Sequence, residues 1–473
     1  MNSYNKKLAG LVFGGALALV ALSTGPAFSQ TLREALAAAY TSNPDLRSQR
    51  ETLRGTVEGV PQALGGWRPT VSLNLNAGRN YSESNSRTSG SREQFRNPHQ
   101  GTVTFTQPLF RGLRTVSGVD KAEADVKKAE ADLNAKEQST LLSAATAFMN
   151  VVRDQATLDL NINNEQVLAR QLQATQDRFN VGEITRTDVS QAEAALAGAT
   201  ANRITSEGVL ETSRATYQQV IGEAPGKLIA PEVVASIPQS REEIIEIARN
   251  AHPAVIAAGY SEKSALSNVD LVKGELLPTL NFVGTLDKTM DGSARGAGGD
   301  LSMSVTGLAK LDLTVPLYEQ GTVYARTRAA KIAAGKSRID LDSVRALRVA
   351  TANQAWDTLR AARAANVSFK AQIDAAAVAL DGIKREASVG SRTVLDVLSS
   401  EQTLLTAQVN LVKSQRDEIV ASYQLKEAVG GLTAEQLNLP VDIYKPNEFY
   451  ARERDRFIGL DVPDLPEASS DTK

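Results

Sequence analysis

Two long stretches of this sequence predict helices that are far longer than a small globular core can cover. Residues 112–180 contain no proline, and Gly118 is their only interior glycine. Residues 321–389 likewise contain no proline. Apolar residues near the start of the first stretch recur at alternating spacings of three and four, namely Val119, Ala122, Val126, Ala129 and Leu133. A helix of about 67 residues spans about 100 Å, so these helices must pack along one another.

The sequence repeats itself at a nearly constant offset of 208 or 209 residues. The recurring pairs are Asn43-Pro44 with His252-Pro253, Pro69-Thr70 with Pro278-Thr279, Val181-Gly182 with Val389-Gly390, and Asp188-Val189 with Asp396-Val397. We interpret this offset as an internal duplication, with repeat 1 at 30–221 and repeat 2 at 241–431. Residues 222–240 then join the repeats, and 432–473 form a final segment with a disordered tail.

Each repeat is predicted to hold an opening helix, a β-hairpin and a long helical hairpin. The β-hairpins are placed at 70–110 and 279–316, and the helical hairpins at 112–221 and 320–430. The strands alternate apolar and small polar residues, as in Val71-Ser72-Leu73-Asn74. Runs of about ten such residues are typical of transmembrane barrel strands, although a soluble sandwich with one wet face has the same pattern. Four strands cannot close a barrel around water, so either fold needs partner chains.

Two polar stretches are predicted as the loops of these β-hairpins. They are Ser82–Pro98 and Thr289–Ser302, which are rich in Ser, Gly, Asn and charge. Long loops on one side of a membrane barrel are usually extracellular, so we expect both loops outside the cell.

The first 29 residues are predicted to be a secretory signal peptide. Lys6 and Lys7 precede an apolar run at 8–22, and Ala27-Phe28-Ser29 supplies small residues for cleavage before Gln30. The rest of the chain has no apolar run of 18 or more residues, so no transmembrane helix is expected. The chain is therefore predicted to be exported.

Composition excludes several kinds of chemistry. The sequence has no Cys, which excludes disulfide scaffolds, thiol catalysis and a lipid anchor on an N-terminal Cys. Its two histidines, His99 and His252, leave little for a histidine metal site or a Ser-His-Asp triad. With 52 basic and 54 acidic residues, the chain lacks the basic excess that nucleic acid requires. We predict no enzyme activity, no metal and no cofactor.

Several motifs resemble the TolC family of outer-membrane export channels. They are Arg178-Phe179-Asn180-Val181-Gly182, the stretch from Ser388 to Leu398, and the tail from Tyr444 to Gly459. The resemblance implies an α+β membrane protein in which three chains form a twelve-stranded transmembrane β-barrel and a periplasmic α-barrel of twelve helices. The segments 222–240 and 432–459 would form a belt around the helices. It also implies a homotrimer in the outer membrane of a Gram-negative bacterium.

The same resemblance assigns a periplasmic gate to the two helical tips. Asp396 matches an aspartate that rings the constriction, and the family's second ring aspartate falls on Ser399. Arg392 matches an arginine that ties the tip helices shut, with Asp188 as its carboxylate partner. A latch tyrosine of the family falls on Ala387, so fewer bonds are expected to hold the gate.

Local helix chemistry offers a second interpretation of these residues. Thr185 with Asp188, and Thr393 with Asp396, have the spacing of capping boxes, which place an acid in the first helical turn whatever its function. The resemblance also implies that the tips dock the periplasmic adaptor, through Val181, Gly182, Thr187, Val389, Gly390 and Thr393. A plain turn explains the two glycines equally well, because a turn favours a residue that accepts positive φ.

The favoured hypothesis is a passive duct that receives proteins or small toxic compounds from a periplasmic adaptor and an inner-membrane pump or ABC translocase. The alternative is a trimeric coiled-coil surface or adhesin protein with a β-anchor. A hairpin in each repeat disfavours the alternative, because adhesins usually carry a single terminal anchor. The sequence does not identify the cargo.

Overall fold

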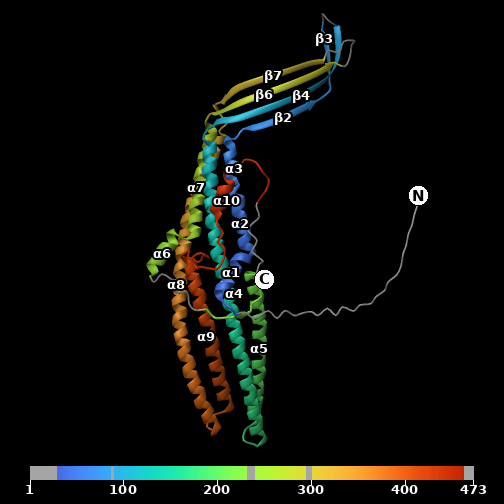
Figure 1. Cartoon of the computed structure of the whole chain (residues 1–473). Helices are drawn as coiled ribbons and strands as arrows, with labels where there is room; N and C mark the ends of the chain where they lie inside the picture. Colours follow the sequence, from blue (N-terminus) through green and yellow to red (C-terminus); the bar gives the residue numbers. More distant parts are fainter. Residues whose placement is uncertain (1–28, 87–89, 232–239, 294–300, 463–473) are drawn as a thin grey trace, which may run out of the picture.

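The computed structural model describes residues 29–86, 90–231, 240–293 and 301–462. The chain is elongated, with a bent sheet at one end of a long helical bundle and two helical tips at the other (Figure 1). The predicted signal peptide, apart from Ser29, and the predicted disordered tail at 463–473 lie outside the described residues.

The two halves of the chain follow the same order of elements, apart from one additional helix and one additional strand in the first half. The first half holds α1 (Leu32–Ser42), α2 (Pro44–Val57), α3 (Gly59–Leu64), η1 (Gly65–Trp67), β2 (Thr70–Ala77), β3 (Asn80–Ser86), β4 (Gly90–Arg111), α4 (Arg114–Asn180) and α5 (Arg186–Ile221). The second half holds α6 (Arg241–Asn250), α7 (Pro253–Lys273), η2 (Gly274–Leu276), β6 (Thr279–Ser293), β7 (Leu301–Thr314), α8 (Thr322–Ser388) and α9 (Val394–Ala428).

Three short elements lie outside this pattern. A parallel pair joins β1 (Ser29–Gln30) to β5 (Lys227–Leu228), and α10 (Pro446–Glu453) follows the second half. The two long helices α4 and α8 have 67 residues each, as the sequence predicts. Among the described helices, none is both long enough and apolar enough to cross a membrane.

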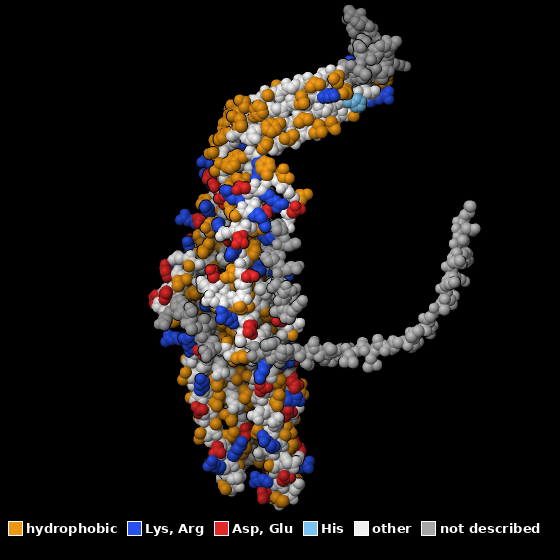
Figure 2. Space-filling view, in the orientation of Figure 1, with side chains coloured by type: hydrophobic (Ala, Val, Ile, Leu, Met, Phe, Trp, Pro, Cys, Tyr) orange, Lys and Arg blue, Asp and Glu red, His pale blue; other side chains and the backbone are white. Residues whose placement is uncertain are grey.

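The sheet has one apolar and one polar face. Its strands run antiparallel in the order β2-β4-β6-β7, and the register places Leu73 opposite Val103 and Val103 opposite Leu286. Residues on the apolar face include Val71, Leu73, Leu75, Val103, Phe282, Leu286, Val305, Leu311 and Leu313, all of them exposed in the single chain. Figure 2 shows hydrophobic side chains spread along the sheet. Asn74, Thr102, Asp287 and Thr306 share the polar face, because they pair with one another in the same register.

The prediction of long hairpin loops was partly wrong, because the strands extend into both polar stretches. Ser82 lies in β3 and Pro98 lies in β4. The long strand β4 pairs with β2 along one part of its length and with β3 along its outer part. Thr289 lies in β6 and Ser302 in β7. The ring of Tyr81 lies 5.0 Å from the ring of Phe95 across the β3–β4 pair, which helps to hold this extension.

Four helices lie side by side near the sheet and again near the tips, but two of the four change halfway along. The helices α4 and α8 run through the whole bundle. Next to the sheet their companions are α2 and α7, and towards the tips they are α5 and α9 (Figure 1). The opening helices thus continue the line of the returning helices.

The first helix-to-helix junction is built by Ser42 and Asn43. The hydroxyl of Ser42 donates to the carbonyl of Ile221 (2.6 Å), and the side-chain amide of Asn43 donates to the carbonyl of Val220 (2.9 Å). The oxygen of the same Asn43 side chain accepts from the backbone N–H of Asp45, so one residue caps the end of α5 and the start of α2.

His252 takes the place of Asn43 at the second junction. Its Nδ1 accepts from the backbone N–H of Ala254 (3.0 Å) and caps α7, while its ring is buried 3.8 Å from the carboxylate of Glu427 on α9. Gly430, with φ of +76°, lies against Pro253, where an added Cβ would meet the proline ring at 3.0 Å. His252 is therefore a buried helix cap.

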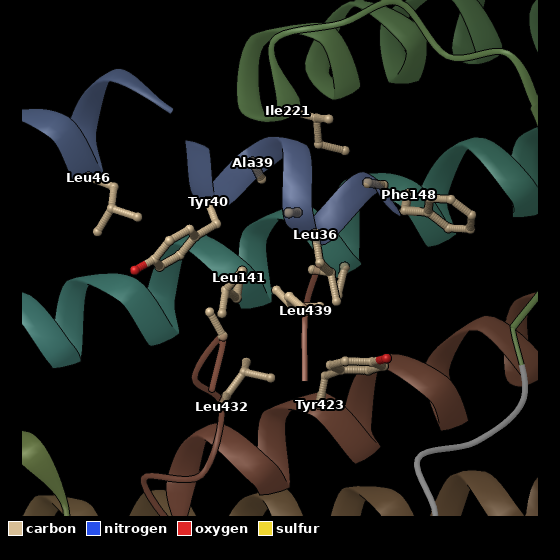
Figure 3. Packing of buried hydrophobic residues seen from close by; sticks show 14 of the residues in the cluster. Leu36, Ala39, Tyr40, Leu46, Leu141, Phe148, Ile221, Tyr423, Leu432 and Leu439 are labelled. Carbon is tan, nitrogen blue, oxygen red and sulfur yellow. The ribbon is translucent and has the colours of Figure 1, made fainter. Parts of the chain in front are cut away.

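The main hydrophobic core lies at these junctions, where α1, α4, α5, α9 and the segment after α9 meet (Figure 3). Leu36, Leu141 and Leu432 are almost completely buried in it. The C-terminal segment is also fastened to the bundle by cation–π contacts, with the guanidinium of Arg54 4.7 Å from the ring centre of Phe449.

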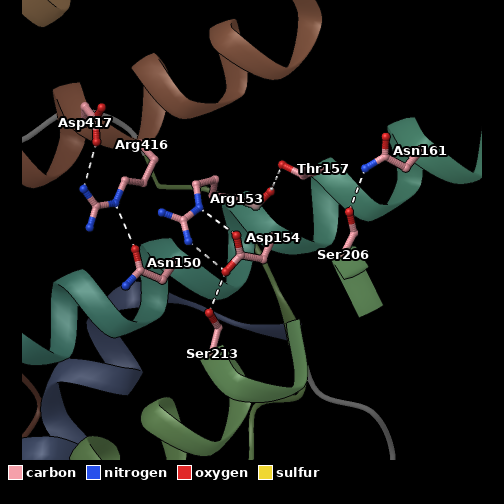
Figure 4. A network of polar contacts seen from close by, with 9 residues as sticks. All are labelled: Asn150, Arg153, Asp154, Thr157, Asn161, Ser206, Ser213, Arg416 and Asp417. Atoms are coloured by element: carbon pink, nitrogen blue, oxygen red, sulfur yellow. Dashed lines mark hydrogen bonds and ion pairs between the residues drawn. The ribbon is translucent and has the colours of Figure 1, made fainter. Parts of the chain in front are cut away.

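A polar network just below the core joins three helices (Figure 4). Arg153 forms two hydrogen bonds with the buried carboxylate of Asp154, which also accepts from the hydroxyl of Ser213 on α5. Arg416 on α9 donates to the side-chain oxygen of Asn150 on α4 at 3.0 Å. This last bond links the two helical hairpins.

Leu141→Ala should destabilise the fold by about 2–5 kcal/mol, because it leaves a cavity in the core where the side chain is 0% exposed. Urea unfolding of the detergent-solubilised protein, followed by circular dichroism, measures the loss. Leu460→Ala is the control, because Leu460 is 99% exposed. Equal midpoints for the two variants would contradict the central role of this core.

Candidate functional site

The two helical tips are built in nearly the same way. After α4 the chain turns at Gly182, with φ of +82°, and after α8 it turns at Gly390, with φ of +81°. The N–H of Gly182 donates to the carbonyl of Phe179, and the N–H of Gly390 donates to the carbonyl of Ala387. Positive φ explains both glycines as helix-terminating residues.

Each returning helix begins with a complete capping box. The backbone N–H and hydroxyl of Thr185 both donate to the carboxylate of Asp188, at 2.9 and 2.7 Å. Thr393 does the same for Asp396, at 3.0 and 2.9 Å. In each box the threonine hydroxyl also accepts from the backbone N–H of the aspartate. Both aspartates thus have a local structural task in the single chain.

These hydrogen bonds hold the pKa values of both aspartates below their usual range. For Asp188 the hydroxyl of Thr185 has the larger effect, and for Asp396 the backbone N–H of Thr393 does. Both groups remain ionised at neutral pH, so each copy of the chain carries a fixed negative charge at the start of α5 and of α9.

The predicted bond between Arg392 and Asp188 is not formed within the chain. The Nε atom of Arg392 instead donates to Glu386 at the end of α8, at 2.8 Å. In the first tip, Arg178 pairs with Glu183 at 3.0 Å across the equivalent turn. Among the described residues, no hydrogen bond or ion pair joins Arg392 to Asp188. Glu386 and Glu183 were not predicted from the sequence as partners of these arginines. The sequence signal that could have identified them is a charge of opposite sign on the other side of each glycine turn.

An apolar contact brings the start of α9 against the first helical hairpin. Val394 and Leu398 pack with Leu168 of α4 and Ala199 of α5. A groove beside this contact is lined by Ser399, Leu395 and Glu401 from α9 and by Gln191 from α5. Ser399 thus faces the space between the two hairpins, three residues after Asp396, which is predicted to belong to the gate.

The residues predicted to dock a partner are exposed at the very ends of the tips. Val181 is 72% exposed and Val389 is 79% exposed, each beside its turn glycine. Thr187 and Thr393 are exposed as well. Exposed valines at both tips give an apolar contact surface that the single chain leaves uncovered. Within the part of the chain that is described, no three His, Asp or Glu side chains gather as metal ligands.

Comparison with known proteins connects this geometry to a protein family. A family model described as "Outer membrane efflux protein" matches residues 35–223 and 244–431. The outer membrane efflux protein BepC of Brucella suis is 35% identical over 440 residues, which cover 93% of both chains. The outer membrane protein TolC of Vibrio cholerae is 26% identical, over 91% of this chain and 97% of its own. The crystal structure of the CmeC outer membrane channel of Campylobacter jejuni superposes with a TM-score of 0.77 at 14% identity, over 96% of this chain and 98% of its own.

The capping boxes should weaken in acid. A carboxyl with a lowered folded-state pKa stabilises the fold fully above its unfolded pKa of about 3.9, and this contribution is lost as the pH falls through the folded value. We therefore expect amide hydrogen exchange at 393–397 to speed up, relative to the chemical exchange rate, only when the pH falls below about 4. Thr393→Ala removes the hydroxyl of the box and should raise exchange there at neutral pH. Thr403→Ala, on the same helix, is the control. Unchanged exchange in Thr393→Ala would show that the box does not hold the tip.

Proposed function

From the premise that this chain belongs to the outer membrane efflux protein family, we propose that three copies assemble into a passive duct for an export system. The chain is an outer-membrane channel protein with a periplasmic helical tunnel. The trimeric assembly, the periplasmic gate and the partner proteins are the parts that we propose.

The main observation that supports a duct is the sheet, which has one apolar and one polar face. Its apolar face suits lipid, its polar face suits water, and the edges β2 and β7 are open in the single chain. Three sheets joined at these edges would close into a twelve-stranded barrel, which removes the open edges. Exposed apolar residues along α8, such as Ile332 at 74% and Ile339 at 70%, support a second copy packed against that helix.

The tips are proposed to be the periplasmic gate and the docking surface. Three copies of Asp396, held ionised by its capping box, would form a negative ring that favours cations. Ser399 in place of a second aspartate would leave this ring with less charge. Because Arg392 is held by Glu386 within its own chain, it would brace the second tip, and a bond to Asp188 would have to come from a neighbouring copy.

The exposed Val181 and Val389 are proposed to bind a periplasmic adaptor, which would connect the duct to an inner-membrane pump or ABC translocase. Catalysis and energy would belong to that pump. The cargo would be proteins, small toxic compounds or both, handed over by the pump. The segments 222–231 and 432–459 would form the belt around the tunnel, and residues 232–239 of the predicted joining segment lie outside the described residues.

Asp396→Asn should lower the cation selectivity of single channels in planar bilayers, because it removes the ring charge while keeping a hydrogen-bonding side chain. The reversal potential in a salt gradient measures the change. Asp374→Asn is the matched control, since it removes the same charge from an exposed position on α8, away from the tip. A particle that never conducts would reject the duct. A conducting trimer with the same reversal potential in both variants would reject only the gate.

A further inference from the structure

A cavity lies where the helices meet the sheet. It is bounded by the end of α2, by α3 and η1, by the start of α4 and by the end of α7. Its lining includes three basic side chains, Arg111, Arg114 and Lys121, together with Thr115. None of these residues belongs to the tips or to the predicted gate.

The positive charge of this cavity is not balanced within the chain. Lys121 pairs with Asp125 at 2.8 Å, and Glu275, the other acid of the lining, pairs with Arg326 at 2.6 Å. Both acids are thus already occupied. Arg111 and Arg114 make hydrogen bonds to backbone carbonyls, and within the described ranges neither has an ion-pair partner. Two guanidinium groups therefore remain available to an anion.

The start of α4 adds to this positive field. The helix begins after Leu113, which has φ of +61° and caps no N–H with its side chain. The first N–H groups of a helix lack partners inside the helix, and the dipole places partial positive charge there. Arg114 and Thr115 are the first two residues of this 67-residue helix.

The hydroxyl of Thr115 independently points to a polar ligand in this cavity. Its side chain is 6% exposed, and its hydroxyl is buried with no hydrogen-bond partner among the described residues. A buried hydroxyl without a partner is unfavourable, and most such groups in proteins are satisfied. The hydroxyl and one Nη atom of Arg111 both lie against Gly66, within 2.8 Å of the position that a Cβ there would occupy. Only a glycine at position 66 leaves this space open.

The register of the sheet shows which side the cavity faces. Arg111 pairs with Thr279, and from Thr279 every second residue of β6 lies on the polar face, including Asn281, Thr285 and Asp287. A β-bulge between Pro108 and Phe110 brings Arg111 into this register. In the proposed duct, the polar face lines the interior, so the cavity would open towards the passing solution.

We propose that this cavity binds a soluble oxyanion, a phosphate or a carboxylate group, through Arg111, Arg114, the hydroxyl of Thr115 and the start of α4. Arginine and free N–H groups are the donors that recognise such groups. In the proposed duct, the site would bind anions at the level where the helices meet the sheet. Its positive charge is opposite in sign to that of the proposed aspartate ring at the tips. The direction of the opening rests on the proposed function, whereas the binding itself does not.

Calorimetric titration of inorganic phosphate into the detergent-solubilised full chain tests the proposal without requiring a conducting pore. Arg111→Gln combined with Arg114→Gln should weaken phosphate binding about tenfold to a hundredfold, since hydrogen bonds to charged groups are lost. Thr115→Val should weaken it about two- to tenfold. Arg170→Gln is the matched control, because it removes an arginine from an exposed position on the same helix.

A second titration, with triglutamate, distinguishes a free anion from the acidic groups of a cargo chain. Binding of phosphate alone identifies the free ion as the occupant. Binding of both probes, weakened in the same variants, identifies carboxylates as well. If phosphate binds the native chain and the double variant equally, or neither probe binds, the proposal is wrong. Should the double variant fail to fold, unchanged binding in Thr115→Val overturns the site equally well.

Discussion

The whole structure depends on the packing of α4 along its full length. A helix of 67 residues is about 100 Å long, and in water most helical stability comes from tertiary contacts. One set of partners cannot cover it, since α2 and α7 accompany only the half near the sheet and α5 and α9 only the half near the tips. The change of partners is therefore the place where the structure needs its strongest packing, and the main core lies there.

Two residues at this change of partners each contact two helices. Asn43 caps the start of α2 and binds the end of α5, and His252 caps α7 while it lies beside Glu427 of α9. Below this level the two helical hairpins are joined by the bond between Arg416 and Asn150 and by the small apolar contact at Leu398. The tips are thus held together much less firmly than the centre, which suits a gate.

Much of the architecture could be predicted from the sequence because its patterns are periodic. The alternation from Val71 to Asn76 predicted the two faces of the sheet, and Gly182 and Gly390 predicted the helical turns. The strand extension at Ser82 and Pro98 was missed, since residues that are polar on both faces carry no period-two pattern. The partner of Arg392 was missed because an ion pair across a turn depends on side-chain conformation, which no spacing records. The cavity at Arg111 depends on close packing against Gly66 and has no sequence pattern at all.

The central claim is that the sheet separates lipid on one face from a water-filled duct on the other. Because the chain has no cysteine, single cysteines introduced at Leu73, Asn74, Thr102 and Val103 test it directly. Labelling in intact outer membranes with a charged, membrane-impermeant maleimide should modify the variants at Asn74 and Thr102 and leave those at Leu73 and Val103 unmodified. Equal labelling of neighbouring positions would contradict the account, because water would then reach both faces of the sheet.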